Sequence, residues 1–460
     1  MKTTTKFLLV LIAALLIPTL SFSQFNLDKL KKSAKKGLSK ISKKTSNSLG
    51  KNNGTSAKTA GNDYYVSPKG RGRVGSKEKP AKDLAALIKK LKKGDVIHIA
   101  AGTYIGKAGL SSDIISVPVS IIGGYSPDFS TRDPWGKYKT IMTGTNELKA
   151  ATTERIGIKA PRMSGEFVLD GLIIDNGPRN RFKTVKKLMI LRKANMEKGE
   201  NPTPETPGIK ILIGSDSKVT IKNCVIMNTA PTQGALDVQI GKNSVAYIEN
   251  NLIINNTGEG IMMKTKHHGN DGLPKFFVKN NTILFNWKHD AFASYGGNSI
   301  MMDGNTEVFA EDNVFGFGDF GGVNNIKQCQ NLLLTNNLFF GHKSYDYQEF
   351  SGGLKLDEMI DYAESINENS DGNFSKEVKI PLNKKWAEIY FSRKMMSRAA
   401  LDASVKASNS GANQLRGMLG LPLQAGSTKM DADVWLHKIE VDDAVKVGYK
   451  KYAGKGCVKP

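Results

Sequence analysis

The feature that most constrains this chain is a short pattern that returns at intervals of 24 to 32 residues. Each copy joins an Asn or Asp turn to a run of apolar residues, as in residues 248–256 (IENNLIINN) and 278–286 (VKNNTILFN). A period of this length is typical of solenoids. Because the apolar runs are short, rich in Val, Ile, Leu and Phe, and bounded by Asn, Asp and Gly, they indicate strands and turns. The repeat therefore predicts an all-β solenoid with a continuous core shared between its coils.

The turn residues of the repeat form one column. Asn tolerates the left-handed conformation and bonds nearby backbone. In coils stacked in register, each amide can also bond the amides above and below it. We therefore interpret the column as a structural ladder, and its first interval of 53 residues as either an insertion or an extra coil. The members of the column are Asp170, Asn223, Asn250, Asn280, Asp312 and Asn336.

A second family of alternating segments lies between the turns, at residues 235–239, 260–264, 291–295 and 322–326. Alternate side chains of a strand point to opposite faces of its sheet. The residues expected to face inward are Leu236, Ile261, Phe292 and Val323. The two outward columns are then Asp237, Met262, Ala293 and Asn324, and Gln239, Lys264, Tyr295 and Ile326.

The beginning of the chain has the composition of an export signal. Residues 1–23 hold two lysines, an apolar run at 7–17 and small residues before Gln24, which predicts a secretory signal peptide. We therefore expect export across the inner membrane to the periplasm, the outer surface or the exterior. No later apolar run is long enough to span a membrane, so we expect no transmembrane span in the mature chain.

Residues 24–62 form a basic tail that holds ten lysines and one aspartate. Apolar residues recur among these lysines at helical spacing. The tail is therefore either a short amphipathic helix that binds an anionic envelope surface or a solvated linker. The whole chain carries a formal net charge of +23, which favours an acidic polymer as its partner. Because export is predicted and no motif interleaves aromatic and basic residues, we expect no nucleic acid.

The cysteines and the common catalytic signatures exclude several classes of protein. Cys224, Cys329 and Cys457 are widely spaced, and no C-x-x-C pair occurs. A disulfide framework or a zinc knuckle is therefore not indicated. The signatures of P-loop nucleotide binding, HExxH metalloproteases and GxSxG serine hydrolases are also absent.

Three segments near the start of the repeat carry a resemblance to a known family. They are residues 63–70 (DYYVSPKG), residues 94–104 (GDVIHIAAGTY) and residues 121–134, which contain IIGGY and FSTRDP. These segments resemble the opening coils of right-handed parallel β-helix proteins of the pectate lyase-like superfamily. The resemblance covers about residues 63–345 and implies that fold.

The resemblance and the composition together give a domain organisation. We assign residues 63–350 to a right-handed parallel β-helix, opened by an N-terminal capping helix near residues 81–91. Residues 177–208 interrupt the repeat and are rich in Lys and Arg, so we interpret them as a basic insertion. The Asn pattern stops in residues 351–460, and we assign these to a small helical C-terminal cap, because solenoids need capped ends.

The resemblance leaves the activity open, since the superfamily includes lyases, hydrolases, epimerases and non-catalytic surface proteins. Its lyases abstract the C5 proton of a uronate with a Lys or Arg base, while donors or a cation neutralise the carboxylate. The resemblance therefore implies Lys264 as the candidate base, with His268 as a second catalytic candidate. The candidate substrate-binding residues are Asp237, Gln239, Glu259, Asp290 and Tyr295 on the coils, and Arg179, Arg181, Lys183, Lys186 and Lys187 in the insertion.

Several alternatives to a lyase stay open. The dipeptide His268-Gly269 matches one found in polygalacturonase-type hydrolases, which use two carboxylates on adjacent coils, but their other motifs are missing. The basic insertion is equally an ordinary solvated loop. Calcium-dependent lyases cluster several aspartates on neighbouring coils, and calcium takes about six oxygen ligands. This sequence lacks such a cluster, so calcium has little support, and no cofactor is required.

The sequence thus predicts an exported β-helix protein that acts on or binds an acidic polysaccharide. If the protein is catalytic, the resemblance favours lyase-type β-elimination. The alternative is a non-catalytic β-helix of the cell surface or matrix, which binds anionic polymer or has only a structural role. The residues do not decide between these interpretations.

Overall fold

The computed structural model describes residues 61–106, 112–145, 154–177, 183–185, 188–190, 206–287, 296–318, 320–342, 344–349, 352–355, 358, 370–375, 440–448 and 452–460. The predicted signal peptide, nearly all of the basic tail and most of the basic insertion lie outside these residues.

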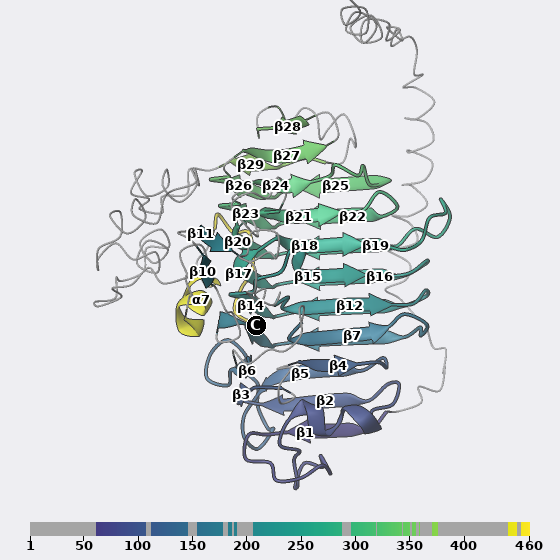
Figure 1. Ribbon diagram of the computed structural model, residues 1–460, viewed down its shortest axis with the longest axis vertical. Coiled ribbons are helices and arrows are strands. Elements are labelled where there is room, and N and C mark those ends of the chain that lie inside the picture. Colours follow the sequence, from purple (N-terminus) through teal and green to yellow (C-terminus); the bar gives the residue numbers. More distant parts are fainter. Residues whose placement is uncertain are drawn as a thin grey trace, which may run out of the picture. The chain divides into compact units, whose positions relative to one another are not determined.

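Three nine-stranded sheets make up the described fold, and successive coils stack on one another (Figure 1). Sheet A contains β1 (Asp63–Val66), β2 (Val96–Ala100), β5 (Ser120–Tyr125), β8 (Glu166–Asp170), β13 (Lys218–Lys222), β16 (Val245–Glu249), β19 (Lys275–Lys279), β22 (Glu307–Glu311) and β25 (Asn331–Thr335). Sheet B contains β3 (Gly102–Tyr104), β6 (Thr140–Met142), β9 (Ile173–Asp175), β14 (Val225–Met227), β17 (Leu252–Thr257), β20 (Thr282–Trp287), β23 (Val314–Gly316), β26 (Leu338–Phe340) and β29 (Phe374–Ser375). Sheet C contains β4 (Asp113–Ile115), β7 (Ile156–Ala160), β12 (Ile209–Ile213), β15 (Gly234–Gln239), β18 (Glu259–Lys264), β21 (Asn298–Met302), β24 (Gly321–Asn324), β27 (Tyr345–Glu349) and β28 (Gly352–Leu354).

Each coil gives one strand to each sheet, so the chain winds as a parallel β-helix. It passes from sheet C to sheet A to sheet B, as in β12, β13 and β14, and then returns to sheet C with β15. Neighbouring strands of a sheet pair in parallel, apart from β27 and β28, which pair antiparallel. The all-β solenoid predicted from the repeat is therefore confirmed.

The interior is a continuous apolar core. One inward column of sheet A runs through the register partners of eight successive strands, and each of its side chains is at most 2% exposed. Burying such a side chain stabilises the fold by roughly 1.5–3 kcal/mol. Because the interior is filled, functional side chains have to lie on the outer faces or in the turns. The members of this column are Ile97, Ile121, Leu169, Ile221, Ile248, Val278, Ala310 and Leu334.

The predicted turn column differs from the structure at its first member. Asp170 pairs with Lys222 in the register, so Gly171 takes the position equivalent to Asn223. Gly171 has a φ of 71°, a conformation that glycine adopts without steric cost. Asp170 instead accepts a hydrogen bond from Asn223 Nδ2 at 2.8 Å. The other members, with φ between 53° and 56°, are Asn223, Asn250, Asn280, Asp312 and Asn336.

A continuous amide ladder is formed by the Asn residues that directly follow the turn residues from Asn250 onward. In each of its first four members, Nδ2 donates to Oδ1 of the equivalent Asn in the next coil, at 2.9–3.1 Å. Nδ2 also donates to a backbone carbonyl of the preceding coil, as from Asn281 to Ile248 at 2.8 Å. These amides are at most 7% exposed, so their hydrogen bonds satisfy groups that would be costly to bury alone. The ladder consists of Asn251, Asn281, Asn313, Asn337 and Asn373.

The structure refines the capping helix predicted near residues 81–91 and decides between an insertion and an extra coil. The N-terminal capping element is a pair of 3-10 turns, η1 (Leu84–Ala86) and η2 (Ile88–Lys90), the first capped by Asp83. The 53-residue interval holds an insertion, because β8 pairs directly with β13 and no coil lies between them. Within the insertion, β10 (Lys183–Val185) and β11 (Leu188–Ile190) form an antiparallel pair.

Residues 291–295, where a strand was expected, lie outside the described residues, and the position beside β18 in sheet C is taken by β21. Ile300 of β21 is the register partner of Ile261 and is fully buried, so it fills the inward position expected for Phe292. Met301 then follows Met262 in the outward column. Both segments hold apolar residues within five positions, so the pattern by itself does not distinguish them.

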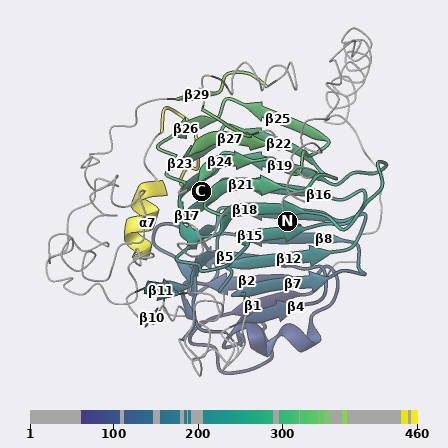
Figure 2. The same ribbon diagram turned by 45° about the horizontal axis from the view of Figure 1, so that its top comes forward.

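The C-terminal residues cover the outer face of sheet B. Helix α7 (Val441–Gly448) contacts β14 and β17, and Figure 2 shows it beside β17. Most of residues 351–460, which we assigned to a helical cap, lie outside the described residues, so that assignment stays a prediction. Val458 N donates to Asn250 Oδ1 at 2.7 Å, and Gly456 N donates to the Asp312 carbonyl at 2.9 Å. The physical reason is that sheet B is apolar on both faces, and its outward residues need cover as much as a core does.

Candidate functional site

The polar side chains predicted on sheet C meet on its outer face. Lys264 Nζ lies 2.9 Å from Asp237 Oδ1 and also donates to Gln233 Oε1. Lys210, on the neighbouring strand β12, places its Nζ 3.6 Å from Asp237 Oδ2. The alternation of β12, β15 and β18 turns these residues outward, because Leu236, Ile261 and Met263 fill the inward positions.

The charges of this cluster do not balance. The Asp237 side chain is 4% exposed, whereas those of Lys264 and Lys210 are 15% and 35% exposed. One carboxylate therefore serves two ammonium groups, and the more exposed of them, Lys210, can bind another anion. Further along the face, Lys159 of β7 pairs with Glu154, which is also buried. We define the lysine cluster as Lys159, Lys210 and Lys264.

Gln239 is the register partner of Lys264 and lies beside it on β15. The amine of Lys264 donates to a carboxylate and to an amide carbonyl, and as an ammonium group it has no lone pair with which to accept a proton. The role of Lys264 as a base stays a prediction that requires this ion pair to open. His268 is exposed in the loop between β18 and β19, and the contacts of Lys264 are with Asp237 and Gln233 instead.

Glu259 lies at the start of β18 with the parity of the inward residues Ile261 and Met263, so it is not part of the outward surface. It is 3% exposed, and its Oε2 accepts a hydrogen bond from Asn298 N at 2.9 Å. Burial raises the pKa of Glu259 to about 7, with the hydrogen bonds from Asn298 opposing the shift. Glu259 is therefore buried in the folded protein, and its role as a substrate ligand stays a prediction.

The remaining predicted site residues fall largely outside the described residues. Asp290 and Tyr295 lie there, and so do Arg179, Arg181, Lys186 and Lys187. Lys183 belongs to β10, of which the structure describes the backbone. Their roles as substrate ligands stay predictions.

The outer face of sheet A carries a feature that the sequence reasoning missed. Tyr247, Phe277 and Phe309 occupy one outward column on β16, β19 and β22. Their rings stack, with centroids 5.2 Å and 4.9 Å apart and planes within 15° of parallel. Each ring stands three residues before a turn residue of the repeat, so an alignment on those turns would have found the column. We call these three residues the aromatic column.

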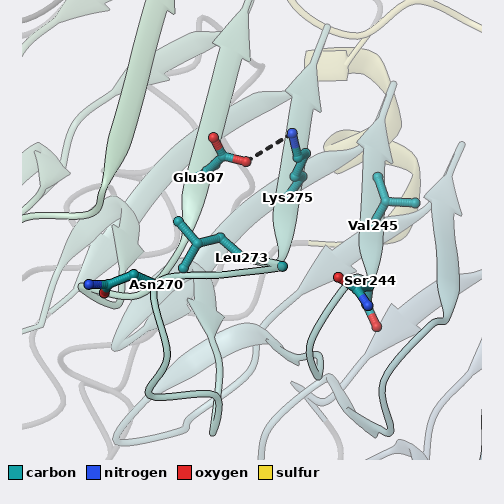
Figure 3. Close-up of a pocket in the computed structure, with 8 residues that line it drawn as sticks. Ser244, Val245, Asn270, Leu273, Lys275 and Glu307 are labelled. Carbon is teal, nitrogen blue, oxygen red and sulfur yellow. Dashed lines mark ion pairs between the residues drawn. The ribbon is translucent and has the colours of Figure 1, made fainter.

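A pocket of about 450 Å³ adjoins the aromatic column at the start of the same strands (Figure 3). Lys275 and Glu307, on the neighbouring strands β19 and β22, form an ion pair in its wall, 3.0 Å apart. Leu273 and Val245 give it an apolar part. The other residues that line it are Asn243, Ser244, Asn270 and Gly272.

Within the described ranges, no three His, Cys, Asp or Glu side chains gather in a way that would hold a metal ion. Cys224 and Cys457 are buried and Cys329 is partly so, and all three are free thiols. No helix in the described part of the chain is long and apolar enough to cross a membrane.

The comparisons with known proteins agree with the fold. A family model described as the right handed beta helix region matches residues 208–356. With the three parallel sheets, this match confirms the right-handed parallel β-helix that the resemblance implied. A search of curated proteins found no match.

Three solved structures are similar to the chain. A pectate lyase, Pel9A, is 13% identical with a TM-score of 0.32, covering 66% of this chain and 74% of its own. XylC in complex with xylose is 9% identical with a TM-score of 0.29, covering 62% and 63%. A rhamnogalacturonan lyase is 10% identical with a TM-score of 0.22, covering 61% and 73%.

Proposed function

We propose that the protein binds acidic polysaccharide on the outer face of sheet C. The observation that carries this proposal is the sharing of one buried carboxylate, Asp237, by the two lysines Lys210 and Lys264. A uronate carboxylate at Lys210 would complete the charge balance and accept hydrogen bonds from the ammonium group. The net charge of +23 would bring such a polymer to the protein, with a dependence on ionic strength.

Binding is favoured over β-elimination as the function of this face. An eliminating enzyme needs a group that can accept the C5 proton. The candidate base, Lys264, is held by Asp237 and Gln233. The function proposed is therefore that of a non-catalytic β-helix that holds an anionic glycan.

The test uses the mature chain and short oligouronates derived from alginate and polygalacturonate. A short ligand reports on one local site, whereas a long polymer would also contact the lysines of the tail. We expect Lys210→Gln to weaken binding roughly fivefold, which corresponds to the loss of about 1 kcal/mol. The matched control is Lys218→Gln on sheet A, whose ammonium already pairs with Glu166 at 2.9 Å; it should leave oligouronate affinity unchanged.

Two results would contradict the proposal. Equal oligouronate affinity in wild type and Lys210→Gln would show that the oligouronate does not bind at the lysine cluster of sheet C. Ultraviolet absorbance of an unsaturated uronate in the same mixtures, lost in Lys264→Ala, would show elimination. The protein would then be a lyase and not a non-catalytic binding protein.

A further inference from the structure

The outer face of sheet A differs in charge from the rest of this basic protein. Two of its lysines each face a carboxylate on a neighbouring strand: Lys218 with Glu166 at 2.9 Å, and Lys275 with Glu307 at 3.0 Å. Lys279 pairs with Glu311 in the same way. Asp170 is shared by Arg132 at 3.0 Å and Lys222 at 3.8 Å, and Glu249 stands between Lys222 and Lys279 in the register. With Arg132 counted beside the four lysines of these strands, five cations therefore match five carboxylates on this face from β8 to β22.

A charge-balanced face does not favour a polyanion. An added uronate would gain no unmatched cation here and would compete with carboxylates that already hold the lysines. Sugar hydroxyls, in contrast, both donate and accept hydrogen bonds, so they can bond an ammonium and a carboxylate at the same time. The pocket at Lys275 and Glu307 offers both groups within 3.0 Å of each other, together with the amide of Asn270.

The aromatic column supplies the apolar part of this surface. Phe277 has Tyr247 on one face of its ring and Phe309 on the other, so its edge is what remains for a ligand. The three rings are partly exposed and form one apolar strip that runs across the strands, along the axis of the coils. Strands repeat about every 4.8 Å along that axis, a length comparable to one pyranose ring. The C–H faces of successive sugars can therefore lie on the strip while their hydroxyls reach the rows of charges beside it.

We propose that this face is a second glycan site, which binds a neutral polysaccharide with one sugar in the Lys275–Glu307 pocket and its neighbours on the aromatic column. It takes a different class of ligand from the lysine cluster of sheet C and does not depend on that site. The ligand carries no net charge and binds by apolar contact and by hydrogen bonds to a pair of opposite charges, so salt has little effect on the binding.

The experiment measures binding of neutral oligosaccharides to the mature chain by calorimetry, with gluco-, xylo- and manno-oligosaccharides as probes and oligouronates in parallel. We expect at least one neutral probe to bind with an affinity that changes less than about twofold between low and high salt. Phe277→Ala should weaken this binding about tenfold, because it removes the central ring of the strip. The matched control is Val168→Ala, which shortens a side chain of the same outward column on β8, outside the aromatic column.

A second variant tests the pocket without touching the aromatic column. Lys275→Ala combined with Glu307→Ala removes both charges of a partly exposed pair and leaves no charge unmatched, so the fold should persist even if Phe277→Ala unfolds. We expect it to weaken the neutral probe several-fold and to leave oligouronate affinity unchanged. The proposal is overturned if no neutral probe binds, if only oligouronates bind in a salt-dependent manner, or if the pocket variant binds the neutral probe as tightly as wild type.

Discussion

The outer faces of sheets C and A belong to the same coils, yet most of their ion pairs differ in how deeply the carboxylate is buried. On sheet C the carboxylates Glu154 and Asp237 are 5% and 4% exposed and lie beneath their lysines. On sheet A the carboxylates of Glu166 and Glu311 are 54% and 39% exposed, and each has its own lysine at the surface. Asp170, at the start of that face, is the exception, because it is 8% exposed and shared by Arg132 and Lys222. A partly buried ion pair costs desolvation that its attraction only partly recovers. An exposed pair costs and contributes little.

This difference shows that the outer faces of one solenoid can differ in how strongly their ion pairs affect stability. The parallel sheets of a β-helix are equivalent as scaffolds, because each provides the same register and strand spacing. What distinguishes them is the depth at which the alternating outward residues are set. Sheet B is the limiting case, since α7 and residues 452–460 cover its apolar outer face completely enough to bury Leu252 and Val314.

The largest effect is expected at Glu259, the buried acid of sheet C. Its pKa in the folded protein is about 7, above the value of 4.5 for a free side chain. The folded state thus binds the proton more tightly than the unfolded chain. The stability from this group is complete below about pH 4.5 and is lost as the pH rises through about 7, on the order of 3 kcal/mol.

Glu259→Gln should therefore be more stable than wild type at about pH 8 and similar to it at about pH 4.5, as measured by urea unfolding. The control on sheet A is Glu166→Gln, which removes an exposed carboxylate. It should change the free energy of unfolding by the same small amount at both pH values. Parallel stability curves for wild type and Glu259→Gln would show that this carboxylate does not titrate in the folded protein.

A smaller loss is expected from Lys264→Met, which leaves Asp237 buried with only Lys210 beside it, 3.6 Å away. Breaking a buried pair on one side costs about 3–5 kcal/mol, and the remaining lysine reduces this to about 2 kcal/mol. Chemical denaturation of the variant and of wild type at neutral pH measures the difference. A loss well below 1 kcal/mol would mean that the sheet C pair behaves as an exposed one.

The smallest effect is expected from the matched change on sheet A. Lys275→Met removes the partner of Glu307 at the surface, where the lysine side chain is 48% exposed, and should cost less than about 1 kcal/mol. The same denaturation experiment checks it. If Lys275→Met and Lys264→Met cost equal amounts, the contrast between the two faces disappears.

Much of the fold could be predicted from local features of the sequence. The turn residues from Asn223 to Asn336 recur because left-handed turns favour Asn, and the apolar runs between them have the alternation of strands. The site was predicted less completely. Asp237 and Lys264 were placed on adjacent strands by counting within two well-aligned segments, and they do meet. Gln233 and Lys210 were missed, because the contacts of a long lysine depend on neighbours in two other strands.

The sequence alone determined the period, the coils and the inward alternation, since these depend on turn chemistry and on residues close in the chain. Only the tertiary structure decided which strand fills each position. It set β21 at Asn298–Met302, turned Glu259 inward and put the buried amide ladder one residue after the predicted column. It also brought Tyr247, Phe277 and Phe309 into one column and laid the C-terminal residues on sheet B. The physical reason is that register between coils is fixed by packing between residues about thirty positions apart, which no local pattern encodes.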